Sequence, residues 1–553
     1  MRESPAFMEN YKLLVSTLSP VHMGSGEDYD PTNYVLDGET LYGFETADLA
    51  SSVLTAEEKE RLSKLVEAPR ALLSIQSFIY TLKDGIAGIA SHTVSVSTAV
   101  SKKYLSQLRK VAQNEGGGRG VINALEISRT AFNLHDQFPL LPGSGLKGSF
   151  RTAVLNSLNV GSQTDMIKTK RIEMREAKDL EKNLLGGSFQ DDPMRLLKIS
   201  DAAWQQVTGN PSTRVVFDTN LPKDKKRLGE ELKSAGLSVM REVIPAMTSR
   251  SFSAQMNLQH ISNGFPKGVP SKQIDFQFLV KACNEYYLAL FKTELTTLES
   301  LDCLDQNWLT LIQDIFSHEL QSLISANKAI LLRVGRHTSA EGITIEGARS
   351  IEIPQRKDDP SRYGNKTATT LWLAGELEKA TKNLQPFGWI LIEIDPDPND
   401  KDSQSLSEKL LKFNHSVWAK ENALKGSMSV KRAEHARKRT EDAAREAESQ
   451  RKKKDEENKE AERNAALAAM SEEARCVQEL RDDMIRGEGR GKGPGCQLAA
   501  KAAALAEKAI EWSVQDKNLL IAFLPDLAKH LGFDLKKHDK WKLRLRALQQ
   551  ISS

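Results

Sequence analysis

The segment Phe138-Pro-Leu-Leu-Pro-Gly-Ser-Gly-Leu-Lys-Gly-Ser-Phe-Arg-Thr152 is the stretch that decides the fold of this chain. Its two prolines favour an extended approach, because proline fixes φ and keeps the residue before it out of the helical region. We predict an amphipathic helix that begins near Ser144, with Leu146 and Phe150 on its apolar stripe. The segment therefore predicts a turn from an extended strand into a helix with one buried face.

The start of this helix also has features that suit an anion. Helix N-termini present free N–H groups and partial positive charge. Gly143, Ser144 and Gly145 surround the start, and the missing side chains of the glycines would let a phosphate backbone come close. Lys147 and Arg151 are four residues apart, so both cations lie on one face. A helix start of this kind can bind the phosphates of a polyanion without recognising its base sequence.

Two common nucleotide-binding motifs do not fit this segment. The order Gly-Leu-Lys-Gly-Ser lacks the spacing of a P-loop. No acidic residue follows at the distance that a dinucleotide-binding βαβ unit requires. A tight turn followed by a helix that merely packs is the alternative, and the segment alone leaves both interpretations open.

Four segments are informative because of their order along the chain. They are Leu14–Gly26, Pro142–Ala153, Leu332–Gly335 and Pro386–Glu393. The second resembles the helix-start motif of the RAMP superfamily, the ferredoxin-like RNA-binding subunits of type III CRISPR effector complexes. The first resembles the opening strand and Gly-rich loop of the Csm-type subunit that caps the 3′ end of the crRNA. The resemblance covers residues 10–395.

The resemblance implies a fold, a function and partners. The fold would be α+β, with ferredoxin-like (RRM-like) RAMP domains, inserted helices and a C-terminal helical extension. The function would be that of a non-catalytic RNA-binding subunit that caps the crRNA 3′ end, supports crRNA maturation and helps bind target RNA in antiviral defence. We expect crRNA, target RNA, a neighbouring RAMP backbone subunit and other type III subunits as partners, and neither a cofactor, a metal ion nor a membrane.

The candidate RNA-binding residues lie beside Gly-rich turns in three places. Cations along a groove suit an RNA backbone, and the resemblance places these loops near the crRNA. An isolated arginine is more often a surface residue, so the recurrence in three places carries the prediction. The candidates are His22, Gly24, Ser25, Gly26, Gly143, Ser144, Gly145, Lys147, Arg151, Arg333, Arg336 and His337.

Acidic residues after the first strand allow a different interpretation. In related backbone RAMP subunits, an aspartate in this loop cuts target RNA, and Asp28 and Asp30 are the candidates in this chain. A carboxylate near a scissile phosphate can position a metal or the attacking 2′-hydroxyl. The capping subunit, however, is regarded as non-cleaving, and acids are ordinary in an exposed loop. A backbone subunit with endoribonuclease activity is therefore the alternative function.

Composition limits the class of protein. The 553 residues suffice for two or three domains. The chain has 77 basic and 74 acidic residues, so its net charge is only +3. Any surface that binds nucleic acid must therefore be a local cluster of basic residues. Mean hydropathy is −0.44 and no apolar run could span a membrane. With no leader peptide pattern, we expect a cytoplasmic protein whose four cysteines are free thiols.

Periodicity and composition predict elements and domain boundaries. We expect a strand over 11–18, a loop over 19–30 and a hairpin over 33–44 that turns at Gly38. After Asp395 a turn-rich segment precedes a helix dominated by Ala, Glu, Lys and Arg. The expected divisions are a first RAMP domain over 1–240, a second RAMP-like half over 241–395, a linker over 396–430, a charged helix over 431–486, a flexible Gly-rich linker over 487–496 and a small helical module over 497–553.

The C-terminal module is locally basic. Contact with RNA, docking of a protein partner and a merely solvated helix face are the three interpretations that its sequence leaves open. The residues concerned are Lys536, Lys537, His538, Lys540, Lys542, Arg544 and Arg546.

Overall fold

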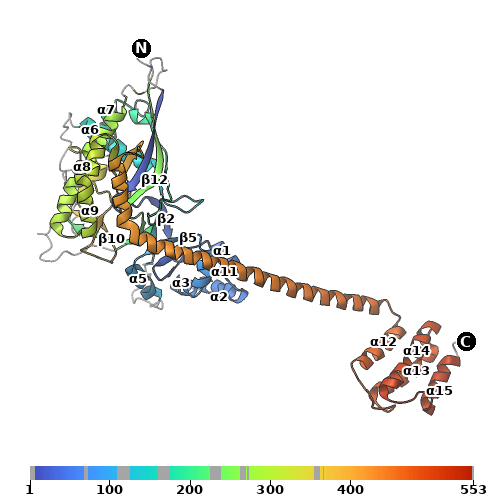
Figure 1. The fold of residues 1–553 in the computed structure, drawn as a ribbon. Coiled ribbons are helices and arrows are strands. Elements are labelled where there is room, and N and C mark those ends of the chain that lie inside the picture. The colour runs from blue at the N-terminus through green and yellow to red at the C-terminus, as the bar shows by residue number, and fades with distance from the viewer. Residues whose placement is uncertain are drawn as a thin grey trace. The chain divides into compact units, whose positions relative to one another are not determined.

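The computed structural model describes residues 7–67, 72–108, 125–159, 174–224, 238–261, 270, 273–353, 361–364 and 367–550. The chain divides into two compact units, Met1–Arg437 and Lys438–Ser553. The first unit is a mixture of helices and strands, and the second is helical (Figure 1). The α+β class predicted from the sequence is therefore confirmed, whereas its ferredoxin-like detail stays a prediction.

The first sheet of the N-terminal unit is built around its opening strand. Strand β1 pairs antiparallel with β12 on one side and with β18 on the other. The order along the sheet is β13-β18-β1-β12-β9-β7, with β8 also on β12. The strands are β1 (Met8–Thr17), β7 (Leu140–Leu141), β8 (Leu197–Ile199), β9 (Ala202–Trp204), β12 (Thr248–Gln259), β13 (Ala329–Arg333) and β18 (Trp389–Ile394).

This sheet differs from the expected division at residue 240. Strands from both expected halves alternate in it, because β1 lies between β12 and β18. Residues 1–240 and 241–395 therefore share one sheet and are not two separate bodies. The reason is that strand pairing depends on apolar faces that meet in space, which a boundary drawn along the sequence does not capture.

The second sheet has the order β2-β6-β11-β10-β5-β4-β3, and β16 joins β10 to β17. The predicted hairpin is confirmed as β3 and β4, with Gly38 at φ 60° in its turn. The loop predicted over 19–30 is wrong for its second half, because Gly24–Tyr29 pairs with β6 through an irregular register. The strands are β2 (Gly24–Tyr29), β3 (Tyr34–Asp37), β4 (Thr40–Gly43), β5 (His92–Val96), β6 (Ile127–Thr130), β10 (Arg214–Pro222), β11 (Met240–Val243), β16 (Thr370–Gly375) and β17 (Gln385–Pro386).

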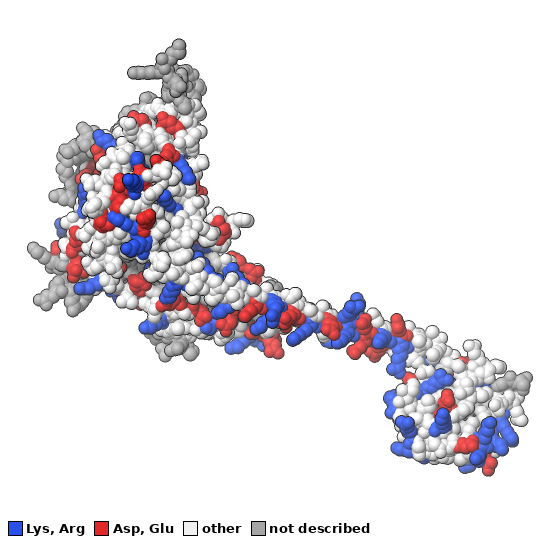
Figure 2. Space-filling view, viewed as in Figure 1, with Lys and Arg blue, Asp and Glu red and all other residues white. Residues whose placement is uncertain are grey.

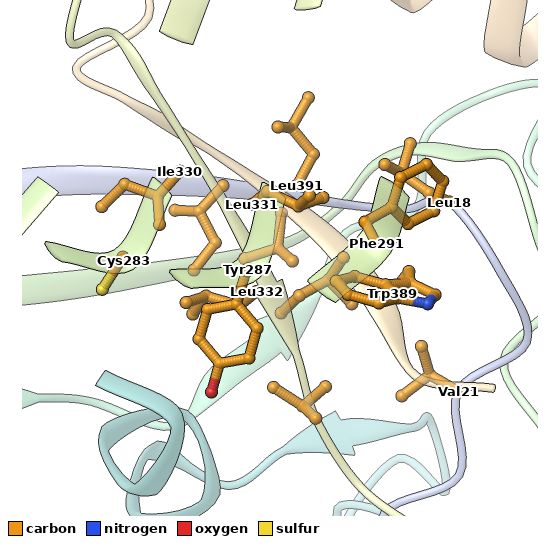
Figure 3. Close-up of a cluster of buried hydrophobic side chains, with 14 of the residues drawn as sticks. Leu18, Val21, Cys283, Tyr287, Phe291, Ile330, Leu331, Leu332, Trp389 and Leu391 are labelled. Carbon is orange, nitrogen blue, oxygen red and sulfur yellow. The ribbon is translucent and has the colours of Figure 1, made fainter. Parts of the chain in front are cut away.

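Helices cover the first sheet and close its core. Helix α8 packs on β13, and α6 packs on α8 (Figure 1). Apolar side chains from the sheet and from α8 meet around the fully buried Trp389 (Figure 3). The helices on this side are α6 (Gly143–Asn159), α7 (Met174–Leu185), α8 (Phe276–Leu301), α9 (Gln306–Ser317) and α10 (Glu319–Ser325). The helix predicted to begin near Ser144 is thus confirmed as α6.

Shorter helices cover the second sheet. Tyr29 and Tyr34 are buried in the core between this sheet and α5, so these rings are core residues. A second small core includes Phe44. The helices are α1 (Thr46–Ser52), α2 (Ala56–Glu67), α3 (Leu72–Thr81), α4 (Lys83–Ile89) and α5 (Thr98–Leu108). The other elements of the unit are η1 (Pro193–Leu196), η3 (Glu341–Ile343), β14 (Ile351–Ile353) and β15 (Arg362–Gly364).

The linker expected over 396–430 is instead helical from residue 401. Helix α11 spans Lys401–Ala468. The turn-rich stretch ends at Asp400, whose carboxylate accepts hydrogen bonds from the Asp402 and Ser403 N–H groups at 3.0 and 3.2 Å. A side chain that satisfies such N–H groups starts a helix. The composition up to residue 400 thus predicts a turn correctly, and the correction concerns residues 401–430.

The first part of α11 is attached to both sheets (Figure 1). Asn414 donates from Nδ2 to the Met247 carbonyl at 2.7 Å, just before β12. The Glu421 carboxylate accepts from Ser95 Oγ of β5 at 2.8 Å and from Ser212 N–H at 2.7 Å. This segment therefore ties the first sheet to the second.

The C-terminal unit has its own apolar core, which includes the buried Phe523 and Trp541. The charged helix expected over 431–486 is divided, because α11 ends at Ala468 and Ser471 caps a new helix. Most of α11 in this region is exposed, with both charge signs intermixed (Figure 2). The helices of the unit are α12 (Glu472–Ile485), α13 (Gln497–Lys508), η4 (Ala509–Glu511), α14 (Val514–Leu531) and α15 (Asp539–Gln550).

Two further expectations concern the whole chain. Cys283, Cys303, Cys476 and Cys496 are all unbonded. Across the described residues, no helix combines the length and the apolar character needed to cross a membrane.

Candidate nucleic-acid interface

The three Gly-rich segments singled out in the sequence meet at His22 and Met23. The Arg336 N–H donates to the His22 carbonyl at 2.8 Å, and Gly335 lies so close that a Cβ would overlap that oxygen. A Cβ on Gly145 would lie 2.6 Å from Met23 Cε. The fold therefore brings together three turns that are more than a hundred residues apart.

A further hydrogen bond connects two of these segments. Ser149 Oγ on α6 donates to the Arg333 carbonyl at the end of β13, at 2.8 Å. On the second sheet, the Met23 N–H donates to Thr130 Oγ1 at 3.1 Å. The junction is thus held by backbone and hydroxyl groups.

The start of α6 is packed against protein rather than open to an anion. The Gly143 N–H donates to Asp201 Oδ1 at 2.7 Å. A Cβ on Gly143 would overlap the backbone of Ile199 and Ser200, so glycine is required there by packing. A carboxylate of the protein already occupies the position that an anion would take at this N–H. Ser144, in contrast, is exposed.

Lys147 and Arg151 share a face of α6 as predicted, but both are engaged within the protein. Lys147 Nζ donates to the Leu197 carbonyl at 2.7 Å. Partial burial, together with the nearby Lys198, lowers the pKa of Lys147. Arg151 binds Asp192 at 2.6 Å and Glu181 of α7 at 2.9 Å.

Those contacts give both cations a structural role. Arg151 connects α6 to α7 and to η1, and its side chain remains about one third exposed. Lys147 holds α6 against β8. Direct contact of either residue with RNA stays a prediction.

Arg333 and Arg336 are placed differently, although they are close in sequence. Arg333 is 2% exposed and forms a buried ion pair with Glu294 of α8. Its Nε also donates to the Phe387 carbonyl at 3.1 Å. Arg336 is exposed. Arg333 thus stabilises the core, while Arg336 presents its charge to solvent.

His22 is buried and uncharged at neutral pH. Its Nδ1 donates to the Glu242 carbonyl at 2.7 Å. Burial lowers the pKa of His22 to about 4, and the nearby Arg241 acts in the same direction. This imidazole therefore supports the junction as a neutral hydrogen-bond donor.

His337 belongs to a buried charge cluster that sequence reasoning missed. Its Nε2 donates to Asp218 Oδ2 at 2.8 Å, and Arg241 donates to the same oxygen at 2.7 Å from Nη2. Burial by itself would raise the pKa of Asp218, but these hydrogen bonds outweigh it and lower the pKa. The His337 ring stacks on Trp372, with centroids 4.8 Å apart.

No local pattern in the sequence pointed to this cluster. Asp218, Arg241 and Trp372 lie on β10, β11 and β16, far from His337 along the chain. Only the pairing of β10 with β11 and β16 brings them together.

Gly24, Gly26 and Asp28 lie on β2, an edge strand, and Asp30 directly follows it. Gly24, Ser25, Gly26 and Asp28 are all exposed, as is Asp30 just after the strand. Gly26 has φ 80°, which favours glycine, and a Cβ there would meet open space. In the described part of the chain, no group of three or more His, Cys, Asp or Glu is placed to hold a metal ion.

Arg129 on the neighbouring strand is a second cation that sequence reasoning missed. Ser25 Oγ donates to the Arg129 carbonyl at 3.0 Å. The guanidinium lies 3.3 Å from the ring centroid of Phe132 and donates to Gln137 Oε1 at 2.6 Å. The side chain is half-buried, so it contributes positive charge beside the β2 loop.

We define the three-loop surface as the exposed residues of the junction. Most of its polar groups are hydroxyls and backbone groups, and its glycines carry no side chains. Among the described candidate residues, Arg336 is the one exposed cation. Such a surface can hydrogen-bond to phosphates and riboses along a strand. Its members are Gly24, Ser25, Gly26, Ser144, Gly148 and Arg336.

Comparison with known proteins identifies the family. The sequence model of the RAMP superfamily matches residues 14–413. No curated protein matches. One similar solved structure is the cryo-EM structure of a Csm-crRNA-target RNA ternary complex in a type III-A CRISPR-Cas system, with 15% identity, a TM-score of 0.39, and coverage of 70% of this chain and 100% of that chain. Another is the crystal structure of T. onnurineus Csm5, with 16% identity, a TM-score of 0.36, and coverage of 68% and 99%. Because the family model covers most of its length, this chain belongs to the RAMP superfamily.

Proposed function

We propose that this protein is a non-catalytic RNA-binding subunit of a type III CRISPR interference complex. The observation that carries the proposal is the convergence of the three Gly-rich segments at His22 and Met23 in a chain of the RAMP superfamily. The exposed three-loop surface is the part of the molecule that we assign to the crRNA.

The contacts of this surface would be with phosphates and riboses. Ser25, Ser144 and the backbone of the loop glycines can hydrogen-bond to a strand without reading its bases. A guide varies in sequence, so a subunit that holds it must rely on such groups. Base pairing with the guide then selects the target RNA, as in other RNA-guided effectors.

The position in the complex rests on the resemblance of Leu14–Gly26 to the Csm-type capping subunit. We infer that the protein binds at the crRNA 3′ end, beside the repeated RAMP backbone subunit, and that the complex works in the cytoplasm. In that position it would bound the guide, support its maturation and help hold target RNA.

The proposal excludes a role for Asp28 and Asp30 in cleavage. Both carboxylates are exposed near the β2 loop, so a nuclease with these residues is the alternative function. Replacing both with alanine should leave target cleavage by the assembled complex unchanged. A loss of cleavage with RNA binding retained would favour the alternative.

The binding proposal has a direct test. The chain is expressed with the products of its neighbouring genes, the complex is purified, and its nucleic acid is extracted. We expect a discrete small RNA whose sequence derives from a repeat array. A complex that assembles without such RNA would contradict the proposal.

A variant assigns the binding to the three-loop surface. Arg336→Gln removes an exposed charge, so stability should change by less than about 0.5 kcal/mol. The affinity for every guide should fall. The slope of log affinity against log salt concentration should become shallower by about 0.7, as expected when one phosphate contact with a single strand is lost. Lys281→Gln is the matched control, because Lys281 on α8 is 70% exposed and is not a member of the three-loop surface. Equal effects of both variants would remove Arg336 from the interface.

A further inference from the structure

The Gly-rich stretch 487–496, expected to be a flexible linker, is packed into the C-terminal unit. The Gly491 N–H donates to the His530 carbonyl at 3.0 Å, and the Gly493 N–H donates to the Leu531 carbonyl at 2.8 Å. A Cβ added to Gly489 would lie only 2.8 Å from Cδ2 of the Leu531 side chain. The stretch is therefore a loop that covers the last turn of α14.

Alternate residues of this loop are glycines in the left-handed region. Gly487, Gly489, Gly491 and Gly493 have φ between 68° and 83°. Cβ atoms on Gly487, Gly491 and Gly493 would meet open space, so backbone conformation rather than packing requires glycine at these three. The loop thus exposes bare backbone to solvent between its side chains.

The loop joins two basic segments of the sequence. Gly532 caps α14. A Cβ added to Gly532 would lie 3.4 Å from Gly491 Cα, so the two backbones are close together. Arg490 and Lys492 flank Gly491, and Lys529 precedes Gly532. Arg490 and Lys492 of the loop therefore lie near the end of α14, where Lys529 is exposed.

The residues after Gly532 extend this positive charge. A β-turn and α15 present Lys536, Lys540, Lys542 and Arg546, all exposed. Trp541 is buried and anchors α15 to the core of the unit. Basic side chains are prominent on the visible face of the C-terminal unit (Figure 2).

Some neighbouring cations are already neutralised and do not belong to this surface. Arg544 binds Glu507 of α13 at 2.7 Å, and Lys537 lies 3.9 Å from Asp534. Within the described part of the chain, no carboxylate forms an ion pair with the remaining ones. We call them the C-terminal basic surface: Arg490, Lys492, Lys529, Lys536, Lys540, Lys542 and Arg546.

We propose that the C-terminal basic surface binds the phosphate backbone of RNA without sequence preference. Unpaired cations spread over a loop and a helix suit a polyanion with regularly spaced charges. The left-handed glycines carry no side chains, so a phosphate can come close to the cations that stand between them in the loop. The site is separate from the three-loop surface, and it extends the proposed function to a second contact with RNA.

An acidic protein is the competing partner, and the surface fits it less well. Protein interfaces are centred on buried aromatic or arginine anchors with few lysines. Most members of this surface are lysines. Leu543 is the one large apolar side chain on the exposed face of α15, with 66% exposure.

The test uses the full-length chain and a fluorescein-labelled oligouridine as probe. The variant carries Lys536→Gln, Lys540→Gln and Lys542→Gln, which are exposed and should leave the fold unchanged. The matched control carries Lys453→Gln, Lys454→Gln and Lys459→Gln on the exposed part of α11, with the same loss of charge. Fluorescence anisotropy at several salt concentrations gives the affinity and its salt slope for each protein.

We expect the basic-surface variant to bind at least about tenfold more weakly at low salt, with a salt slope smaller by about 2, since three phosphate contacts contribute about 0.7 each. The control should match the unmodified chain. Equal behaviour of variant and control would overturn the proposal, as would competition by polyglutamate as effective as that by unlabelled RNA.

The outcomes also separate this inference from the proposed function. Loss of binding in Arg336→Gln with no effect of the lysine variant would leave the proposed function standing and refute the second site. Loss in the lysine variant alone would support the second site and remove Arg336 from the interface.

Discussion

Gly335→Ala is the sharpest test of the junction at His22 and Met23. Gly335 has φ 80° and a Cβ position that overlaps the His22 carbonyl oxygen. That oxygen accepts the Arg336 N–H at 2.8 Å. Because the overlap is with backbone, no side-chain rotation relieves it, and the two segments must separate.

The structure gives the size of the effect. A left-handed conformation costs a residue with a Cβ about 1–2 kcal/mol. Separation of the segments breaks the bond to the Arg336 N–H, and a buried carbonyl left without a partner costs about 1–3 kcal/mol. The variant should therefore lose about 2–5 kcal/mol of unfolding free energy in the N-terminal unit.

Gly347→Ala is the matched control. Gly347 has φ 82°, but the nearest atom to its Cβ position is 3.6 Å away, so only the backbone cost of about 1–2 kcal/mol applies. Hydrogen exchange in increasing urea, read on peptides that cover 18–24 and 330–340, measures the N-terminal unit separately from the C-terminal one. If the two variants lose the same free energy, Gly335 does not lie against His22, and the convergence of the three segments is wrong.

Three further predictions concern buried groups. Arg333→Met leaves the Glu294 carboxylate buried and unpaired, so urea denaturation should show a loss of about 3–5 kcal/mol, and a loss under 1 kcal/mol would contradict the ion pair. Burial lowers the pKa of His22 from 6.5 to about 4 in the folded protein. As the pH falls from 6.5 to 4, His22 is therefore protonated in the unfolded chain before it is protonated in the folded one. The free energy of unfolding should fall by up to about 3 kcal/mol over that interval. A His22→Gln variant should lack this part of the pH dependence; an unchanged profile would assign it to other groups. Asn414→Ala leaves the Met247 carbonyl without its donor and should lower the free energy of unfolding by about 1–3 kcal/mol. If hydrogen exchange in β12 stays unchanged in this variant, α11 does not stabilise the sheet.

Local patterns predicted those elements whose cause is local. The strand at Tyr11, the hairpin at Gly38 and the helix at Ser144 follow from alternation, a turn glycine and helical spacing, and all three are present. The strand at Gly24 was missed because glycine and acidic residues disfavour strands, and only pairing with β6 stabilises it. The helical state of residues 401–430 was missed because the preceding Asp and Pro residues suggested that the turn continued.

The roles of the basic residues could not be predicted, because their partners are distant in sequence. Arg151 binds Asp192, and Arg333 binds Glu294, each about forty positions away. The spacing of the cations on α6 was correct, yet spacing does not show which carboxylates the fold brings near. A basic motif in a Gly-rich turn can therefore hold the turn in place instead of presenting its charge to a ligand.

That result bears on where the affinity for RNA would come from. Since Lys147, Arg151 and Arg333 are engaged within the protein, the three-loop surface has a modest positive charge and would position a strand through hydrogen bonds. Electrostatic attraction scales with the number of phosphates neutralised, so a surface of this kind binds weakly by itself at physiological salt. The cations of the C-terminal basic surface could supply the missing attraction.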